Sequence, residues 1–343
     1  MTKTAQQNES LLRVEGLKKY FPIEKGFFRK HVGLVKAVDD VSFAVRRGES
    51  LGLVGESGCG KTTLGRCLLR VIEPTDGDIQ FRFNDLSFDF RKLNPKELRS
   101  MRKYAQMIFQ DPYSSLNPRM TVMDIIAEPL RVNNLASGSE LQDRVRELVD
   151  TVGLDVKHMK RYPHAFSGGQ RQRIGIARAL ACHPPFIVAD EAVSALDVSV
   201  QAQILNLLKR LQRDFHITYL FITHDLGVIH HVSDRVMVMY LGKVVELAET
   251  RELFRKPLHP YTEMLLGAVP KIGSEGVSRY SSPGEPPNPA APPPGCAFHP
   301  RCKYADALCR SEVPSLRDAG GGHMVSCHRA CQAESTDAAA TAE

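Results

Sequence analysis

The sequence predicts an α/β fold around a parallel sheet, and three short apolar runs carry this prediction. They span residues 50–54, 185–189 and 218–223, and each is followed by polar residues or glycine. Amphipathic stretches with helical spacing lie between them, as expected for strands that feed helices. Strands buried on both faces of a parallel sheet are continuous apolar runs, and ligands bind beyond their carboxyl ends. We therefore expect the functional residues just after these runs.

Length and composition limit the class of protein. At about 150 residues per domain, 343 residues suggest one large domain with an appendage, or two domains. The chain is 43% hydrophobic and 24% charged, which is ordinary globular usage. Its formal charge of +6 is too small and too scattered to require a nucleic-acid partner, although a membrane-surface partner stays open. Without a long apolar run or a secretory leader, we expect a cytoplasmic chain that does not span a membrane.

The cysteines are unevenly distributed. Five of the eight lie in the last fifth of the chain, beyond a proline-rich stretch at 283–294: Cys296, Cys302, Cys309, Cys327 and Cys331. A cytosolic chain is kept reduced, so clustered cysteines there indicate a metal or cluster site more than disulfides. The proline-rich stretch sustains neither a helix nor a central strand, and it predicts a semi-rigid linker.

A phosphate-binding loop is predicted directly after the first apolar run. The pattern G-x-x-x-x-G-K-T lies between a predicted strand and a predicted helix at 61–70, where consecutive backbone N–H groups and the helix dipole face a polyphosphate. A glycine-rich turn without a ligand is the alternative, and this context disfavours it. The lysine would reach the β- and γ-phosphates, and the threonine hydroxyl would ligate Mg²⁺. The residues are Gly55, Glu56, Ser57, Gly58, Cys59, Gly60, Lys61, Thr62 and the adjoining Thr63.

Polar residues also follow the other two runs. Asp190, at the end of the second run, is placed to hold Mg²⁺ through water, and Glu191 is then free to polarise the attacking water. His224 follows the third run, just before a predicted helix, and a neutral imidazole there suits a contact with water or the γ-phosphate. The alternatives are a surface turn with two acids and a structural histidine. The phosphate loop favours the functional interpretation.

A second glycine motif opens a predicted helix at 171–181. Ser167 and Gln170 have capping-box spacing, so a well-capped helix start is the simplest interpretation. Gly168 and Gly169 would weaken such a helix by about 1 kcal/mol each relative to alanine, which capping does not explain. Exposed N–H groups at a helix start form an anion site. Two phosphate sites on one chain make sense if a nucleotide is sandwiched between two subunits.

In their order along the chain, these motifs resemble those of the ATP-binding subunits of ABC transporters. Residues 166–170 match the family signature, and residues 194–197 match the loop that contacts the opposite ATP site. Tyr20 matches the aromatic that stacks on adenine, Gln110 the glutamine that senses Mg²⁺ and the attacking water, and His224 the switch histidine. The resemblance implies catalytic roles for Lys61, Gln110, Glu191 and His224, Mg²⁺ held through Thr62, Gln110 and Asp190, and ATP contacts from Tyr20, residues 55–63, residues 167–170 and Asp197.

The resemblance also implies a domain organisation. A P-loop ABC ATPase domain over residues 10–268 would have a parallel-sheet core, an antiparallel β subdomain and an inserted helical subdomain at about 93–182. The proline-rich linker would occupy 269–294. A small Cys-rich C-terminal module would span 295–331, before a disordered tail at 332–343.

A narrower resemblance covers nearly the whole chain. Residues 110–118, 194–203, 259–262 and 295–298 are similar to the ATPase subunits of dipeptide and oligopeptide importers, most closely the dipeptide F-type subunit. This implies ATP-driven uptake of short peptides at the cytoplasmic face of the bacterial inner membrane, although the same branch includes importers of nickel and glutathione. The implied partners are a second ATPase subunit in a heterodimer, two transmembrane permease subunits and, indirectly, an external peptide-binding protein. A soluble non-transport ABC protein is the less favoured alternative, because the second nucleotide module or long coiled coil of such proteins is missing.

The spacing of the clustered cysteines leaves the bound group open. It is neither that of a zinc ribbon nor the tight run of a ferredoxin, and four thiolates suit either Zn²⁺ or an iron–sulfur cluster. The resemblance implies a 4Fe-4S cluster held by Cys296, Cys302, Cys309 and Cys327. Zinc and no metal are the alternatives, with His323, His328 and Cys331 as spare donors. Nothing in the sequence places this module near the ATP site, so we expect a structural or regulatory role.

Overall fold

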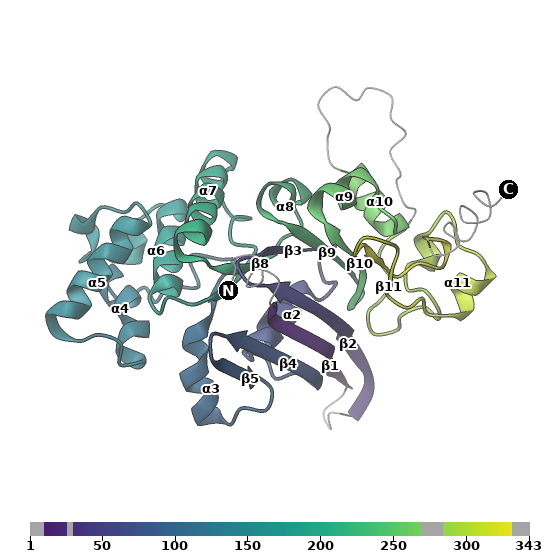
Figure 1. Ribbon diagram of the computed structural model, residues 1–343, viewed down its shortest axis with the longest axis horizontal. Helices are drawn as coiled ribbons and strands as arrows, with labels where there is room; N and C mark the ends of the chain where they lie inside the picture. The colour runs from purple at the N-terminus through teal and green to yellow at the C-terminus, as the bar shows by residue number, and fades with distance from the viewer. Residues whose placement is uncertain (1–9, 26–29, 269–283, 331–343) are drawn as a thin grey trace. The chain divides into compact units, whose positions relative to one another are not determined.

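The computed structural model describes residues 10–25, 30–268 and 284–330, and these form two compact units (Figure 1). Unit 1 comprises residues 10–13, 44–50 and 80–222, and unit 2 comprises residues 14–25, 30–43, 51–79, 223–268 and 284–330. None of the helices in these ranges has both the length and the apolar character needed to cross a bilayer. The predicted tail, Cys331 and most of the predicted linker lie outside the described residues.

The sheet of unit 1 confirms two of the predicted strands. Strands β8 (Thr218–Ile222), β7 (Phe186–Asp190) and β6 (Ala105–Ile108) are parallel and lie in that order. Every residue of β7 and β8 is buried because both faces of these strands are covered, and their sequences are apolar apart from Asp190 at the end of β7 and Thr218 at the start of β8. Asp190 is paired with Ile222, so the carboxyl ends of the two strands are level with each other.

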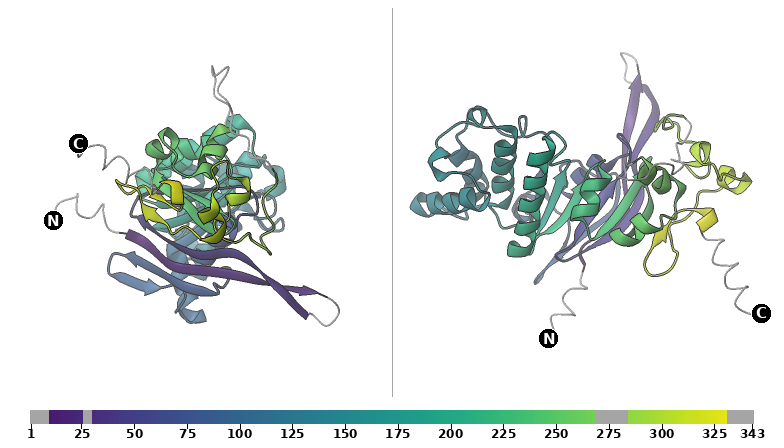
Figure 2. Two further views of the ribbon diagram at one scale, coloured as in Figure 1. Left: turned by 90° about the vertical axis from the view of Figure 1, so that its right-hand side faces the viewer. Right: turned by 90° about the horizontal axis from the view of Figure 1, so that it is seen from above.

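Helices make up most of the rest of unit 1. They are α3 (Pro95–Met101), α4 (Val122–Val132), α5 (Gly138–Thr151), α6 (Gly168–Leu180) and α7 (Val198–Phe215), with 3₁₀ turns at Arg102–Tyr104, Val156–His158 and Pro163–Ala165. Helices α4, α5 and α6 pack against one another (Figure 2). The range expected to be a helical subdomain, 93–182, also contains strand β6, which pairs with β7. The sequence prediction missed β6 because the strand has only four residues.

The sheet of unit 2 holds the first predicted strand. Strand β3 (Ser50–Val54) pairs in parallel with β9 (Arg235–Tyr240), which pairs antiparallel with β10 (Lys243–Glu249). Two short strands from the end of the chain, β12 (Met324–Val325) and β11 (Arg317–Asp318), extend this sheet beyond β10. The helices of unit 2 are α2 (Lys61–Leu68), α8 (Leu226–Val232), α9 (Thr250–Arg255), α10 (Pro260–Gly267) and α11 (Ala307–Ser311), with a 3₁₀ turn at His299–Arg301.

A separate sheet contains four strands in the order β2-β1-β4-β5. Its strands are β1 (Ser10–Lys25), β2 (Lys30–Arg46), β4 (Asp76–Phe83) and β5 (Leu86–Asp89). Strands β4 and β5 are antiparallel, and Phe81 lies opposite Phe88. Together with Phe90, these rings form an aromatic cluster with centroids 5.1 to 5.6 Å apart. Such offset and edge-on pairs add to the stability that burial provides.

The C-terminal segment, defined here as residues 284–330, belongs to unit 2. Its Phe298 side chain is 1% exposed and packs against Tyr240 and Tyr261, with both ring centroids 5.4 Å away. Near the end of the segment, the His323 Nε2 atom lies 2.7 Å from Oε1 of the buried Glu246. Strand pairing, aromatic packing and this polar contact therefore join the segment to the rest of unit 2.

Candidate active site

The loop after β3 has the backbone geometry that its glycines require. Gly55 and Gly60 have φ angles of 155° and 108°, which side chains rarely tolerate. A Cβ atom on Gly55 would overlap the carbonyl oxygen of Met239, and one on Gly60 would overlap that of Ala37. Glycine is thus needed for the conformation and for the close approach of neighbouring backbone. The loop forms a cradle, and the side chain of any residue other than glycine at these positions would fill it.

The helix that follows this loop begins without a side-chain cap. Gly60 is the N-cap of α2 and supplies no side-chain cap, and the first turn contains no acidic residue. The Lys61 side chain is 6% exposed, and its Nζ atom donates to the carbonyl oxygens of Gly55 at 2.7 Å and Glu56 at 2.9 Å. An uncapped helix start with a lysine inside the loop suits an anion with several oxygens. The residues present therefore fit a nucleotide polyphosphate.

His224 follows β8, and the residue before it contacts β3, the strand that leads into this loop. The preceding residue, Thr223, donates its backbone N–H to the carbonyl oxygen of Leu53 at 3.2 Å. The following residue, Asp225, caps α8 by accepting from the backbone of Gly227 at 2.7 Å. These contacts fix the backbone on both sides of His224, whose side chain is exposed. This placement is consistent with the sequence prediction of a histidine beside the loop.

Tyr20, the residue expected to stack on adenine, is fixed through its phenol. Its hydroxyl donates to Oδ1 of Asp39 at 2.5 Å, and burial together with this bond raises the pKa of Tyr20. Burial also raises the pKa of Asp39, but hydrogen bonds from Tyr20 and Lys243 outweigh it and leave that pKa lowered. The Lys36 Nζ atom lies 5.5 Å from the centre of the Tyr20 ring. The hydrogen bond to Asp39 therefore holds the ring in one orientation, with the Lys36 cation close to it.

In unit 1, the structure brings Gln110 and Glu191 together. The Gln110 Nε2 atom donates to Oε2 of Glu191 at 2.6 Å. Glu191 has a φ of 46° and donates its backbone N–H to the carbonyl oxygen of Ile222 at 2.8 Å. Left-handed backbone at a residue other than glycine is costly and concentrates at functional sites. Asp190, only 2% exposed, ends β7 immediately before it, as predicted.

The start of α6 confirms the predicted capping box and supplies a different reason for one glycine. The Ser167 hydroxyl accepts from the Gln170 backbone at 3.3 Å, and the Gln170 side chain accepts from the Ser167 backbone at 3.0 Å. A Cβ atom on Gly169 would overlap a methyl group of Val200 on α7. Close contact between α6 and α7 therefore requires glycine at position 169, a packing reason that no sequence pattern indicated.

Asp197, from the predicted loop at 194–197, caps helix α7. Its Oδ1 atom accepts from the Val200 backbone at 3.0 Å and from the Ser199 hydroxyl at 2.7 Å. These hydrogen bonds lower the pKa of the Asp197 carboxyl, with the Ser199 hydroxyl as the largest cause. The carboxylate is exposed and ionised at neutral pH. It can therefore cap α7 and still contact a second chain.

The C-terminal segment reaches the phosphate-binding loop, contrary to the sequence analysis, in which nothing placed it near the ATP site. Arg301 donates from both terminal guanidinium nitrogens to the carboxylate of Glu56, at 2.8 and 3.0 Å. These residues are 245 positions apart in the sequence. No motif or periodicity signals such a contact, so sequence reasoning missed Arg301.

The four predicted cluster ligands are neighbours, but they do not form a ligand set. Burial raises the pKa of the Cys296 thiol to about 11, and the nearby thiols of Cys309, Cys327 and Cys302 also raise it. The Cys296 backbone donates to the carbonyl oxygen of Cys309 at 2.8 Å. Across the described residues, no three His, Cys, Asp or Glu side chains are grouped so that they could hold a metal ion. The donor chemistry therefore fits a metal or cluster, and the described geometry does not.

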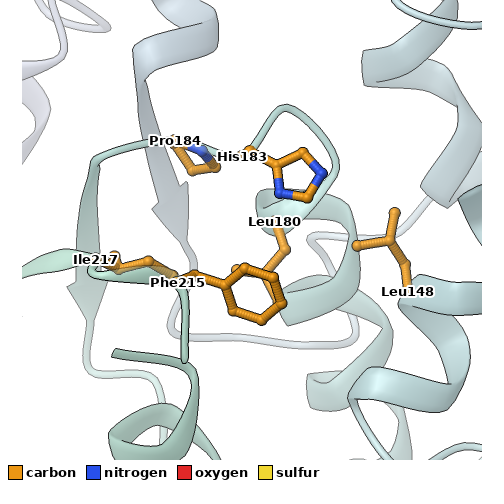
Figure 3. Close-up of a pocket in the computed structure, with 6 residues that line it drawn as sticks. All are labelled: Leu148, Leu180, His183, Pro184, Phe215 and Ile217. Atoms are coloured by element: carbon orange, nitrogen blue, oxygen red, sulfur yellow. The ribbon is translucent and has the colours of Figure 1, made fainter. Parts of the chain in front are cut away.

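A small apolar pocket in unit 1 is unrelated to these residues (Figure 3). It has a volume of about 50 Å³ and is lined by Leu148, Leu180, His183, Pro184, Phe215 and Ile217. Ligand sites for molecules of drug size occupy roughly 300 Å³ or more. The pocket is too small for a nucleotide.

A glycine cradle between a strand and a helix, with a buried lysine at its end, defines a P-loop nucleotide-binding protein. The family described as ABC transporter matches residues 38–194, and the family described as oligopeptide/dipeptide transporter, C-terminal region, matches residues 245–309. A solved structure of the ATP-binding cassette MJ0796 bound to ADP and Pi has a TM-score of 0.61 and 27% identity, covering 70% of this chain and 99% of that one. This likeness confirms the P-loop ABC ATPase fold.

Curated relatives are similar over almost the whole chain. The oligopeptide transport ATP-binding protein AppF of Bacillus subtilis is 53% identical over 329 residues, covering 95% of this chain and 99% of the relative. The dipeptide transport ATP-binding protein DppF of Escherichia coli is 46% identical over 334 residues, covering 97% and 98%. The chain belongs to the family of ABC transporter ATP-binding proteins that includes these oligopeptide and dipeptide transport proteins.

Proposed function

We propose that this chain hydrolyses ATP to drive the uptake of dipeptides or short oligopeptides, as the ATP-binding subunit of an ABC importer. One observation carries the proposal: the loop of residues 55–62 is a glycine cradle that opens onto the uncapped start of α2, with Lys61 inside it. Backbone N–H groups and a helix dipole bind polyphosphate at such a place. The names of the two relatives above support peptides as the transported class.

The residues have separate roles in this proposal. Residues 55–63 hold the phosphates, with Lys61 on the β- and γ-phosphates, and Tyr20 supports the base. Bound Mg²⁺ supplies charge that offsets the phosphates, and its expected ligands are Thr62, Gln110 and Asp190. Glu191 polarises the attacking water as general base. The hydrogen bond from Gln110 supports this role because it orients the carboxylate, and His224 contacts the γ-phosphate.

The proposal also includes partner chains. Ser167, Gly168, Gly169, Gln170 and Asp197 would contact nucleotide bound to a second ATPase subunit, and a heterodimer follows from the resemblance. The family implies transmembrane permease subunits as partners, an external peptide-binding protein that delivers substrate, and a peripheral position at the cytoplasmic face of the inner membrane. The domain boundaries stated above, with the ATPase domain at 10–268, belong to the same proposal.

The cysteines of the C-terminal segment are proposed to hold a 4Fe-4S cluster, with Zn²⁺ as the alternative. The effect of the neighbouring thiols on the pKa of Cys296 supports a shared site, although no three His, Cys, Asp or Glu side chains of the described residues are grouped as a ligand set. Anaerobic purification followed by visible absorption, iron and zinc analysis tests this. About four irons per chain and a brown colour support the cluster, and a colourless protein without iron rejects it.

Uptake by cells tests the transport function. Cells lacking this chain are complemented with the wild type, Glu191→Gln or the matched control Glu140→Gln, which loses an exposed ion pair with Arg144 in the same unit. We expect the wild type and the control to restore accumulation of a labelled dipeptide, and Glu191→Gln to fail. Restoration of nickel or glutathione uptake instead would reassign the substrate. An ATPase that supports no uptake of any of the three would favour a non-transport role.

A further inference from the structure

An ion pair between Arg301 and Glu56 links the C-terminal segment to the phosphate-binding loop. The side chain of Arg301 is 7% exposed and that of Glu56 is 26% exposed, so the pair is largely shielded from water. The two hydrogen bonds run in parallel from the guanidinium group to the carboxylate. Such bidentate pairs are stronger and more specific in geometry than single contacts.

The position of Arg301 is fixed by its neighbours. Its backbone donates to the carbonyl oxygen of Phe298 at 3.0 Å, within the 3₁₀ turn His299–Arg301. Phe298 is in turn buried against Tyr240 and Tyr261. The guanidinium group is therefore held at the loop by a packed aromatic anchor, and little rotamer freedom is left to be lost when the pair forms.

Glu56 is held at three points. Its backbone N–H donates to the hydroxyl of Tyr261 at 2.8 Å, its carbonyl oxygen accepts from Lys61 Nζ at 2.9 Å, and its carboxylate binds Arg301. The position of Glu56 therefore determines where the start of the loop lies. A carboxylate on a loop that binds polyphosphate repels the ligand unless a cation neutralises it. Arg301 supplies that cation.

We propose that Arg301 is a positioning residue of the phosphate-binding loop, which makes nucleotide affinity depend on the C-terminal segment. The proposal rests on the proposed function, since it assumes that the loop binds ATP. Arg301 acts through Glu56, by fixing its carboxylate and cancelling its charge. Loss of Arg301 leaves a negative charge beside the phosphates, and removal of both charges restores a neutral loop.

Titration of the full-length chain with a fluorescent ATP analogue and Mg²⁺ tests this. We expect Arg301→Met to raise the Kd about tenfold, which is equivalent to ~1.4 kcal/mol, and to raise the KM for ATP more than it changes kcat. The double variant Glu56→Gln/Arg301→Met is expected to bind within about threefold of the wild type. Lys303→Met is the matched control, because Lys303 in the same segment pairs with Glu263 of α10 at 3.0 Å.

A Kd for Arg301→Met within about twofold of the wild type overturns the proposal. A double variant that binds as weakly as Arg301→Met also overturns it, because the loss would then come from structural damage and not from the charge of Glu56. Should Arg301→Met not fold, Arg301→Lys keeps the charge but loses the paired geometry, and a Kd equal to that of the wild type would contradict a positioning role. Lys61→Ala separates the two proposals: if it leaves the measured Kd unchanged, the proposed function of the loop fails irrespective of Arg301.

Discussion

Replacement of Phe298 by alanine tests whether the C-terminal segment is an integral part of unit 2. The ring is 1% exposed and lies 5.4 Å from Tyr240, 5.4 Å from Tyr261 and 5.7 Å from His259, measured between centroids. Deletion of a buried phenylalanine ring costs about 3 to 5 kcal/mol, because apolar burial is lost and a cavity remains. Three aromatic neighbours place Phe298→Ala in the upper part of this range. We expect the free energy of unfolding to fall by about 4 to 5 kcal/mol.

Urea unfolding followed by circular dichroism and tyrosine fluorescence measures this change, and the absence of tryptophan leaves tyrosine as the fluorescent probe. Val313→Ala is the control, because this residue of the same segment is 60% exposed. Its substitution is expected to cost about 0.5 kcal/mol or less. A loss below about 1 kcal/mol for Phe298→Ala, or a loss equal to that of the control, would show that the segment does not share a core with unit 2.

Three further changes test the loop, the acidic strand end and a buried histidine. Gly60→Ala should abolish nucleotide binding or unfold the chain, because its Cβ would overlap the Ala37 carbonyl. Gly58→Ala should cost only about 1 kcal/mol, because Gly58 has a φ of 79° but its Cβ would have no neighbouring atom within 4 Å. Equal effects of the two variants in a nucleotide titration would contradict this expectation. Glu191→Gln should retain MgATP binding but hydrolyse it at least about 100-fold more slowly, and a near-normal phosphate-release rate would remove Glu191 from its role. Burial lowers the pKa of His259, and the nearby Glu246 carboxylate offsets only part of this effect, which leaves the pKa at about 4. The imidazole of the unfolded chain titrates near 6.5, so below that pH protonation favours the unfolded state. The free energy of unfolding should therefore be highest above pH 6.5 and fall by about 2 kcal/mol between pH 7 and pH 5. His259→Gln should flatten this dependence in urea titrations, and an unchanged slope would rule out His259 as its source.

The sequence could predict those parts of the fold that leave a local pattern. Strands β3, β7 and β8 were expected because five consecutive buried residues leave an unbroken apolar run. Helix α2 was expected from the loop motif, and the capping box of Ser167 and Gln170 from a spacing of three residues. Each of these signals lies within a few positions of the structure that it predicts.

Long-range contacts leave no such pattern. Arg301 and Phe298 look like ordinary residues of a short turn, and only the folded chain brings them to Glu56 and Tyr240. Gly169 illustrates the same limit, because what requires glycine there is a methyl group of Val200 on another helix. Strands β11 and β12 have two residues each, which is too short for alternation to be recognised. The site residues that sequence reasoning missed are therefore those that act across the fold.

The pairing of β12 with β10 has a consequence for how the protein is made. Glu246 and Leu247 of β10 pair with Val325 and Met324, which are synthesised after every other strand of this sheet. The phosphate-binding loop, in contrast, is made early, and domains generally fold from the N-terminus as the chain grows. The edge of the unit 2 sheet thus stays open until β12 has been made, and an unpaired edge is where chains associate wrongly. A message truncated before residue 324 would yield a chain that contains the whole loop but cannot cover this edge.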